Sequence, residues 1–292
     1  MNSLHDATRL AETSRPRTPA AAKPGRELPV RVVVGVVLAC IAIAVTLAGG
    51  IYFAGFVALA ASAAAREWHR MVGSANFGSE AAVTIAAIIV SIGLVIQTRT
   101  FAWPLAALAA GAVLAAVWSA FRGAPAGWSA LGAPYAGLAA CALVALREWV
   151  VHGPWVVLGV FLVIWTADTG ALLAGRLLGG PKLVPALSPN KTWAGLAGGL
   201  LLPALVAAGY VAIFRGSPVW AAILGLILAT TGHAGDLFES WVKRRVGRKD
   251  SGELIPGHGG VLDRLDSTLF VAPIAAALVF MVDVGPLLGV QP

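Results

Sequence analysis

The sequence predicts an all-α fold, a polytopic integral membrane helix bundle with about nine transmembrane helices. The chain of 292 residues is 58% hydrophobic and only 12% charged, and its mean hydropathy is +0.82. Soluble domains carry about 25% charged residues, so a lipid bilayer must be the solvent for much of this surface. Cys40 and Cys141 both lie in apolar runs, which indicates small buried side chains rather than a disulfide or a metal site.

Nine apolar segments have about the length needed to cross the hydrocarbon layer. That crossing takes roughly 20 helical residues, because unpaired backbone groups are not tolerated in lipid. The segments lie near residues 29–48, 51–66, 80–98, 102–121, 127–146, 154–175, 194–214, 218–238 and 267–289. Gly49-Gly50 leaves room only for a tight helical hairpin between the first two, and Asp283 and Gly285-Pro286 interrupt the last.

The basic residues predict the orientation. With a cytoplasmic N-terminus, nine spans place all but three of the 21 Lys and Arg residues on the cytoplasmic side; the exceptions are Arg99, Arg147 and Arg215. Cytoplasmic loops carry the excess of Lys and Arg in membrane proteins. The bias therefore predicts a cytoplasmic N-terminus and an odd number of spans.

The distribution of charge divides the chain into three predicted regions. Residues 1–27 are rich in Pro, Ala and Arg and are predicted to be a disordered basic cytoplasmic tail, without the pattern of a cleaved signal. Residues 28–150 hold few ionisable groups and are predicted to be an N-terminal transmembrane scaffold of about five helices. Residues 151–292 are predicted to be a C-terminal transmembrane catalytic region of about four helices plus cytoplasmic loops.

Acidic residues concentrate in that third region. Half of the 14 acids fall at predicted cytoplasmic helix ends or in the loops between them: Asp168, Asp236, Glu239, Asp250, Glu253, Asp263 and Asp266. Charge beside lipid is costly, so we interpret this group as functional. Asp236, Glu239 and Ser240 share one helix face, and Asp263 and Asp266 lie one turn apart. Carboxylates without His or Cys partners suit Mg²⁺, which usually also binds substrate phosphates.

Basic residues and glycines lie between these acids. Five Lys or Arg residues occur between Lys243 and Lys249, and the turn Pro256-Gly257-His258-Gly259-Gly260 follows. Glycines let backbone N–H groups approach an anion closely. Alone, the basic run is typical of a patch that attracts anionic lipids, and the Pro-Gly pair is typical of a turn. These separate interpretations do not explain why carboxylates that suit a cation occur together with Lys and Arg residues that suit phosphate.

A second polar element precedes the seventh segment. In Ser188-Pro189-Asn190-Lys191-Thr192-Trp193, Ser188 or Thr192 could cap the following helix, and Lys191 could contact a phosphate beside its positive end. Upstream, Asp168-Thr169-Gly170 lies inside the sixth segment. Asp168 either takes part in binding or forms a structural ion pair with Arg176, two turns along the same helix.

The run from Ser240 to Asp266 resembles the signature of the phosphatidate cytidylyltransferases, the CDP-diacylglycerol synthases. Its parts are Ser240, Lys243-Arg244, Lys249-Asp250, Pro256 to Gly260, and Asp263-Arg264-Leu265-Asp266. The segments around Asp168 and from Ser188 to Trp193 are also similar to motifs of that family, although Ala194 stands where the family often has Glu. The resemblance covers roughly residues 165–270.

The resemblance implies that CTP and phosphatidate are converted to CDP-diacylglycerol and pyrophosphate with a divalent metal, as a step of phospholipid biosynthesis. The phosphate of the lipid is already an anionic nucleophile, so alignment and charge neutralisation are the main requirements. We hypothesise that Asp236, Asp263 and Asp266 hold Mg²⁺, with a second divalent or monovalent cation left open. As hypotheses, catalytic roles are assigned to Asp263, Asp266, Lys243 and Lys249. Substrate binding is assigned to Ser188, Lys191, Thr192, Ser240, Arg244, His258, Gly259, Gly260 and Arg264.

Three alternatives remain open from the sequence. A related lipid-nucleotide or polyprenol phosphotransferase would use another lipid. A secondary transporter would show two matching halves, whereas here the charge crowds one face and one half of the chain. A lipid-binding scaffold would leave the acids without a role. We expect a multi-pass protein of the bacterial inner (plasma) membrane with its site on the cytoplasmic side, no nucleic-acid partner, and a homodimer left open as an assembly.

Overall fold

The computed structural model describes residues 24–73, 78–248, 250–252, 254 and 259–281. Nine α-helices occupy most of these residues, and each predicted apolar segment coincides with one of them. The helices are α2 (Pro24–Ala48), α3 (Gly50–Val72), α4 (Ser79–Thr98), α5 (Ala102–Phe121), α6 (Ala126–Glu148), α7 (Gly153–Leu177), α8 (Trp193–Ile213), α9 (Pro218–Arg245) and α10 (Leu262–Met281).

Seven of the described helices, α4 to α10, are long and apolar enough to cross a membrane. In α2 the apolar part is the shorter stretch Val32–Ala48. In α3 the last turns carry Arg66, Glu67 and Arg70, which lower the hydropathy of an otherwise apolar helix. The prediction of a helical membrane protein is therefore confirmed, and the count of nine spans stays a prediction.

Two helices extend beyond the apolar segments that predicted them. Helix α9 continues to Arg245, seven residues past the predicted end, and α10 begins at Leu262, five residues before its predicted start. Lysine and arginine continue a helix well and favour its C-terminal end, whereas an acid such as Asp263 favours the first turn. The signature residues at both ends are therefore held on helices. The predicted interruption after residue 281 lies outside the described residues.

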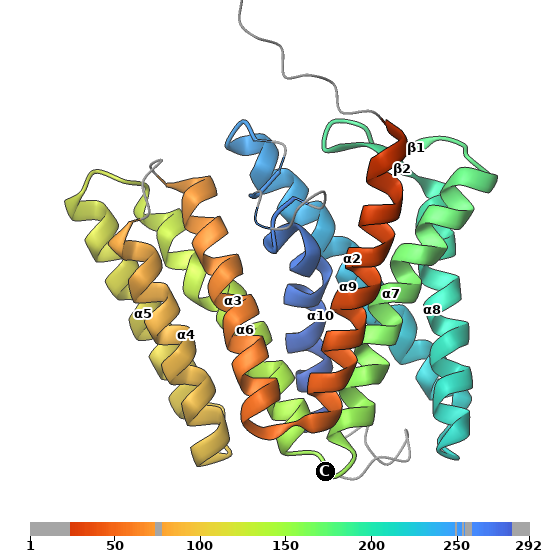
Figure 1. Cartoon of the computed structure of the whole chain (residues 1–292), viewed down its shortest axis with the longest axis horizontal. Coiled ribbons are helices and arrows are strands. Elements are labelled where there is room, and N and C mark those ends of the chain that lie inside the picture. Colours follow the sequence, from red (N-terminus) through yellow and green to blue (C-terminus); the bar gives the residue numbers. More distant parts are fainter. Residues whose placement is uncertain (1–23, 74–77, 249, 253, 255–258, 282–292) are drawn as a thin grey trace, which may run out of the picture. The chain divides into compact units, whose positions relative to one another are not determined.

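Within the compact unit formed by residues 39–292, consecutive helices run in opposite directions (Figure 1). Helices α7, α8 and α9 pack as one set of neighbours, and α4, α5 and α6 as another. Helix α6 contacts α10, which in turn packs on α9. The other unit, residues 1–38, is described from Pro24 and contains the first part of α2. The three predicted regions of the chain remain a prediction.

Small residues set the separation between α7 and α8. A Cβ on Gly198 would lie 2.6 Å from the carbonyl oxygen of Gly170, so neither position has room for a side chain. Without a hydrophobic effect between helices in lipid, such close backbone contact is a main source of association. This contact fixes the end of α8 from which the Ser188–Thr192 segment emerges.

Residues 182–192 form a β-hairpin, which the all-α prediction did not include. Strand β1 (Lys182–Val184) pairs antiparallel with β2 (Ser188–Thr192), with Lys182 opposite Thr192 and Val184 opposite Ser188. Pro189 is tolerated because a two-stranded sheet consists of edge strands. The hairpin replaces the predicted irregular loop and gives Lys191 a fixed position.

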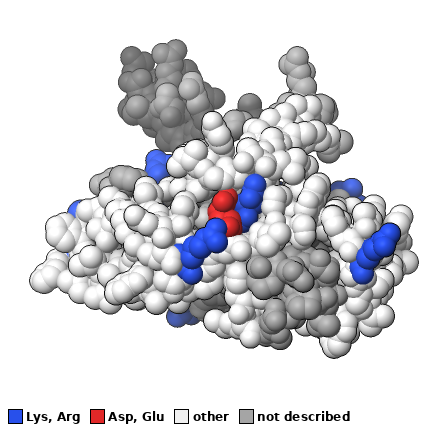
Figure 2. Space-filling view, turned by 90° about the horizontal axis from the view of Figure 1, so that it is seen from below, with Lys and Arg blue, Asp and Glu red and all other residues white. Residues whose placement is uncertain are grey.

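Away from the hairpin, a small polar network joins the end of α2, the start of α3 and the end of α6. Helix α2 ends at Ala48 and α3 begins at Gly50, which confirms the predicted tight hairpin. The Gly50 N–H donates to Glu148 Oε1 at 2.8 Å, and Arg147 donates to the carbonyl oxygen of Leu47 at 3.2 Å. Figure 2, which views this face from below, shows few charged side chains on its described surface.

Candidate active site

A polar cavity of about 490 Å³ lies between α7, the hairpin, α8 and α9. Its charged and polar lining comes from three separate segments: Asp168 and Arg176 on α7, Asn190, Lys191 and Thr192 on β2, and His233 and Asp236 on α9. The remaining lining is mainly Ala, Gly and Leu. The fold therefore brings the predicted residues Asp168, Lys191, Thr192 and Asp236 together around one cavity.

An ion pair closes one side of this cavity. The Lys191 ammonium contacts the Asp236 carboxylate, so β2 is tied to α9 across the space. Ser240, one turn along α9, lies with its hydroxyl 3.5 Å from Asp236 Oδ1. Thr192 caps α8, because its hydroxyl oxygen accepts from the Gly195 N–H at 3.0 Å. The capping role foreseen for this segment is thus confirmed for Thr192.

Asp168 faces the cavity from α7. Its charge interacts with those of Lys191, Arg264 and Asp236. The predicted alternative, an ion pair with Arg176, is wrong, because no salt bridge joins these two described residues. Eight residues along one helix correspond to about 12 Å along its axis, which is beyond the reach of the pair. Asp168 therefore belongs to the cavity rather than to a structural pair within α7.

A second charged cluster lies where α9 meets the start of α10. Lys243 Nζ is 3.1 Å from Glu239 Oε1, one turn back on α9, and 2.8 Å from Asp263 Oδ1 on α10. The Glu239 side chain is completely buried, and that of Asp263 is 10% exposed. One ammonium group thus lies between two acidic side chains from different helices.

Asp263 is held by the backbone as well. Its carboxylate accepts from the Gly260 N–H at 2.9 Å and from the Ser251 N–H at 3.1 Å. Gly259 has φ +79°, in the left-handed region that favours glycine, and a Cβ there would lie 3.0 Å from Asp263 Oδ2. Gly259 and Gly260 therefore shape the loop around Asp263, a contact that the sequence interpretation, which assigned them to phosphate, did not foresee.

Asp266 lies one turn further along α10. Its carboxylate accepts from the Ser267 N–H at 2.6 Å and interacts electrostatically with Asp236, Asp168 and Lys243. Among the described residues, no three His, Cys, Asp or Glu side chains form a cluster ready to hold a metal ion. The shared metal site predicted for Asp236, Asp263 and Asp266 therefore stays a prediction. Its support here is limited to the electrostatic interaction between Asp236 and Asp266.

The remaining predicted residues fall in several places. Arg244 donates from Nε to the carbonyl oxygen of Leu187 at 3.4 Å, which links α9 to the turn of the hairpin. Arg264 is exposed on the first turn of α10, within electrostatic range of Asp168. Ser188 takes part in the hairpin pairing. Lys249 and His258 lie outside the described residues.

Three residues near the site were not assigned from the sequence. His233 lines the cavity, Glu239 is the buried partner of Lys243, and Glu67 on α3 contacts the loop around Asp263. Glu239 was placed on the correct helix face but received no role. Glu67 lies just after an apolar run that ends at Arg66, and an acid in that position is a signal that the scaffold interpretation overlooked.

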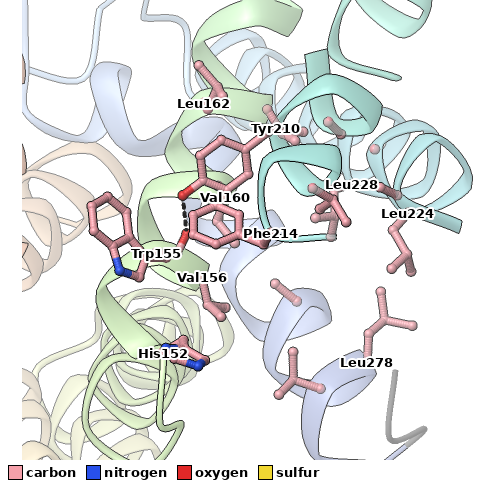
Figure 3. Close-up of a pocket in the computed structure, with 18 residues that line it drawn as sticks. His152, Trp155, Val156, Val160, Leu162, Tyr210, Phe214, Leu224, Leu228 and Leu278 are labelled. Atoms are coloured by element: carbon pink, nitrogen blue, oxygen red, sulfur yellow. Dashed lines mark hydrogen bonds between the residues drawn. The ribbon is translucent and has the colours of Figure 1, made fainter. Parts of the chain in front are cut away.

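An apolar pocket of about 220 Å³ lies at the other end of α7, α8, α9 and α10 (Figure 3). Aromatic residues form one wall, where the Tyr210 hydroxyl donates to the carbonyl oxygen of Trp155 at 2.8 Å. His152 is the one ionisable ring besides Tyr210 among its lining residues, and no Lys, Arg, Asp or Glu lines it. This pocket offers apolar contact and is unsuited to a phosphate group.

The fold and the polar cavity define a membrane-embedded enzyme that handles phosphate groups. Lys191 and the carboxylates of Asp168 and Asp236 meet in it, among helices long and apolar enough to cross a membrane. The sequence pattern of the cytidylyltransferase family matches residues 29–282, and the chain belongs to this family.

Curated relatives agree with the family. The chain is 39% identical over 266 residues to the phosphatidate cytidylyltransferase of Brucella suis biovar 1 (strain 1330), covering 87% of this chain and 92% of the relative. The phosphatidate cytidylyltransferase of Rickettsia bellii (strain RML369-C) is 42% identical over 128 residues, which cover 41% of this chain and 55% of the relative. That of Staphylococcus haemolyticus (strain JCSC1435) is 48% identical over 122 residues, 40% of this chain and 46% of the relative.

Proposed function

We propose that this protein transfers the cytidylyl group of CTP to phosphatidate, giving CDP-diacylglycerol and pyrophosphate. The observation that carries the proposal is the match to phosphatidate cytidylyltransferases over most of the chain. The structure supports it independently, because β2, α9 and α10 together form two lysine–carboxylate clusters beside apolar helices. A nucleotide triphosphate and a lipid phosphate need that combination of charge and apolar surface.

The proposed reaction is an in-line displacement at phosphorus. An oxygen of the phosphatidate phosphate forms a bond to the α-phosphorus of CTP, and the bond from that phosphorus to the β-phosphate oxygen breaks. The nucleophile is already an anion, so the residues need not remove a proton. We assign to Lys191, Lys243 and Arg264 the roles of offsetting the phosphate charge and holding the two substrates in register; their places beside Asp236, Asp263 and Asp168 support this assignment. Arg244 and Lys249 are assigned supporting phosphate contacts.

We further propose that Asp236, Asp263 and Asp266 hold Mg²⁺ during turnover. The donor chemistry fits, because these are hard carboxylate oxygens, and Asp236 and Asp266 interact electrostatically. Since the described residues form no closed cluster of three acids, we expect the ion to keep waters and to complete its shell with substrate phosphates. Bound there, the ion would polarise the α-phosphorus and offset negative charge.

The membrane arrangement is also a proposal. Nine spans with a cytoplasmic N-terminus place both charged clusters at the cytoplasmic face, where CTP is available. The positions of the described helices and the bias of Lys and Arg to one side support this arrangement. The relatives come from bacteria, which supports an inner-membrane location.

A direct assay tests the proposed function. Detergent-purified protein is incubated with labelled CTP and phosphatidate, with Mg²⁺ or with excess chelator, and with a panel of other lipid phosphates. We expect CDP-diacylglycerol and pyrophosphate in equal amounts, only with Mg²⁺ and with phosphatidate preferred. Transfer to an isoprenoid phosphate instead would show a related phosphotransferase, and the absence of any transfer would contradict the proposal.

A further inference from the structure

Glu67, on the last turns of α3, is an acid buried within the bundle. Glu67 is 1% exposed, although it lies on a helix that the sequence analysis placed in the N-terminal scaffold. Glu67 Oε2 accepts from the Leu262 N–H at 2.8 Å and from the Ser251 hydroxyl at 3.3 Å. These partners lie far along the chain, on the segment that leads into α10. Burial of a carboxylate is costly, and the two hydrogen bonds to Oε2 offset part of that cost, while Oε1 has no hydrogen-bond partner among the described residues.

Both partners of Glu67 are closely connected to Asp263. Ser251 donates from its backbone N–H to Asp263, while its hydroxyl donates to Glu67. Leu262 is the first residue of α10, and its N–H is one of those that the helix itself leaves without a partner. Glu67 therefore caps α10 from another helix and fixes the residue that immediately precedes Asp263.

Two glycines leave space for the Glu67 carboxylate. A Cβ at Gly252 would lie 2.5 Å from Glu67 Oε1, and a Cβ at Gly260 would overlap both Glu67 Oε2 and the Ser251 hydroxyl. Gly260 also donates its N–H to Asp263. Ser251 and Gly260 thus lie against two carboxylates at once, those of Glu67 and Asp263.

We propose that Glu67 is a positioning residue for cytidylyl transfer. It holds Ser251 and the start of α10 so that the Asp263 carboxylate stays against Lys243, at the orientation that the reaction needs. This inference rests on the proposed function, and it assigns a role in the site to a helix outside the signature. A residue that acts through Asp263 affects the rate of the chemical step more than the binding of either substrate.

The test compares Glu67→Gln with Glu80→Gln, a matched control. Glu80 is also a buried acid of the N-terminal helices, 9% exposed, and its carboxylate lies 3.9 Å from Arg122 rather than near the loop. Glutamine keeps the size of Glu67 but is neutral, so its single carbonyl oxygen accepts from Leu262 and Ser251 more weakly than a charged carboxylate does. We expect kcat to fall roughly 10-fold or more in Glu67→Gln, with KM for CTP and phosphatidate within about twofold, and Glu80→Gln to keep normal kinetics.

A second variant and a cycle separate positioning from folding. Glu67→Asp keeps the charge but is one methylene too short, so it should also lose kcat while remaining folded. In the double variant Glu67→Gln/Ser251→Ala, the effects on kcat should be less than additive, because both changes weaken the same contact. Additive effects, or a loss of kcat that follows the folded fraction alone, would overturn the inference.

Hydrogen–deuterium exchange supplies a readout that does not depend on activity. In Glu67→Gln, the peptides that contain Ser251 and Leu262 should exchange faster, while peptides of α4 and α5 should not change. If the wild-type protein made no CDP-diacylglycerol but the exchange changed as expected, the proposed function would fail and the contact would stand. Wild-type kcat together with unchanged exchange would refute the role of Glu67.

Discussion

Lys243 lies between the carboxylates of Glu239 and Asp263, and this arrangement gives Asp263 a role that differs from that of a freely exposed acid. Three donors, the Lys243 ammonium and the N–H groups of Ser251 and Gly260, fix its orientation. An acid fixed in this way can present its charge to a substrate or an ion without reorganisation, and such preorganisation is a large source of rate acceleration.

Asp263→Asn tests this residue directly. Asparagine keeps the shape but removes the charge that faces Lys243, so we expect turnover to fall roughly 100-fold or more. The activity assay with CTP and phosphatidate measures the loss. Glu148→Gln, at the other end of the helices, is the control and should stay active. Membrane insertion and elution as a single species should be unchanged in both, and near-normal activity of Asp263→Asn would contradict the assignment.

The hairpin offers a matched pair of lysines for a second test. Lys191 pairs with Asp236 across the cavity, whereas Lys182 on the neighbouring strand is exposed. We expect Lys191→Ala to raise the KM for CTP or phosphatidate by roughly 10-fold, because a charge-assisted phosphate contact is lost. Lys182→Ala should leave both constants near normal. Equal effects of the two changes would show that the hairpin contributes only general positive charge.

At the scale of elements, helix α9 runs from the apolar part of the bundle to the proposed site. It has 28 residues, so it is about 42 Å long and exceeds the roughly 30 Å of the hydrocarbon layer. Its first part is apolar and its last three turns carry Asp236, Glu239 and Lys243. These three residues are therefore held on a helix and not on a loop. The helix end predicted near residue 238 came too early to include Glu239 and Lys243.

The contact between α7 and α8 is equally important, because α8 begins where β2 ends. Gly198→Ala should force these helices apart and cost about 1–3 kcal/mol, as overpacking does elsewhere. Gly209→Ala on the same helix meets nothing within 4 Å and should be neutral or slightly stabilising. Thermal unfolding in detergent measures both. A stable, fully active Gly198→Ala protein would show that the close contact does not position Lys191.

At the scale of the whole molecule, the orientation in the membrane decides where the substrates enter. Asp250 is exposed beside the proposed site, and Ser217 lies in the connection before α9 at the other end. In a background without Cys40 and Cys141, a membrane-impermeant thiol reagent added to intact cells should label Ser217→Cys and spare Asp250→Cys. Lysed cells should label both. The reverse pattern would place the site on the outer face and contradict the cytoplasmic assignment.

Much of this architecture is readable from the sequence for a simple reason. An apolar run must form a helix in lipid, since only a helix pairs its own backbone groups there, so the positions of α2 to α10 follow from hydropathy. The helical ends were less predictable. Charged residues such as Lys243 and Asp263 are compatible with a loop or a helix, and only neighbouring helices determine which forms.

The sequence by itself determined that the chain is a helical membrane protein and that its signature resembles one family of enzymes. Local chemistry was sufficient there, because hydropathy and motif spacing are properties of short segments. Only the tertiary structure decided that Lys191 meets Asp236, that Lys243 lies between two acids, and that Glu67 reaches the start of α10. Those contacts join residues from different helices, and their partners depend on how the helices pack.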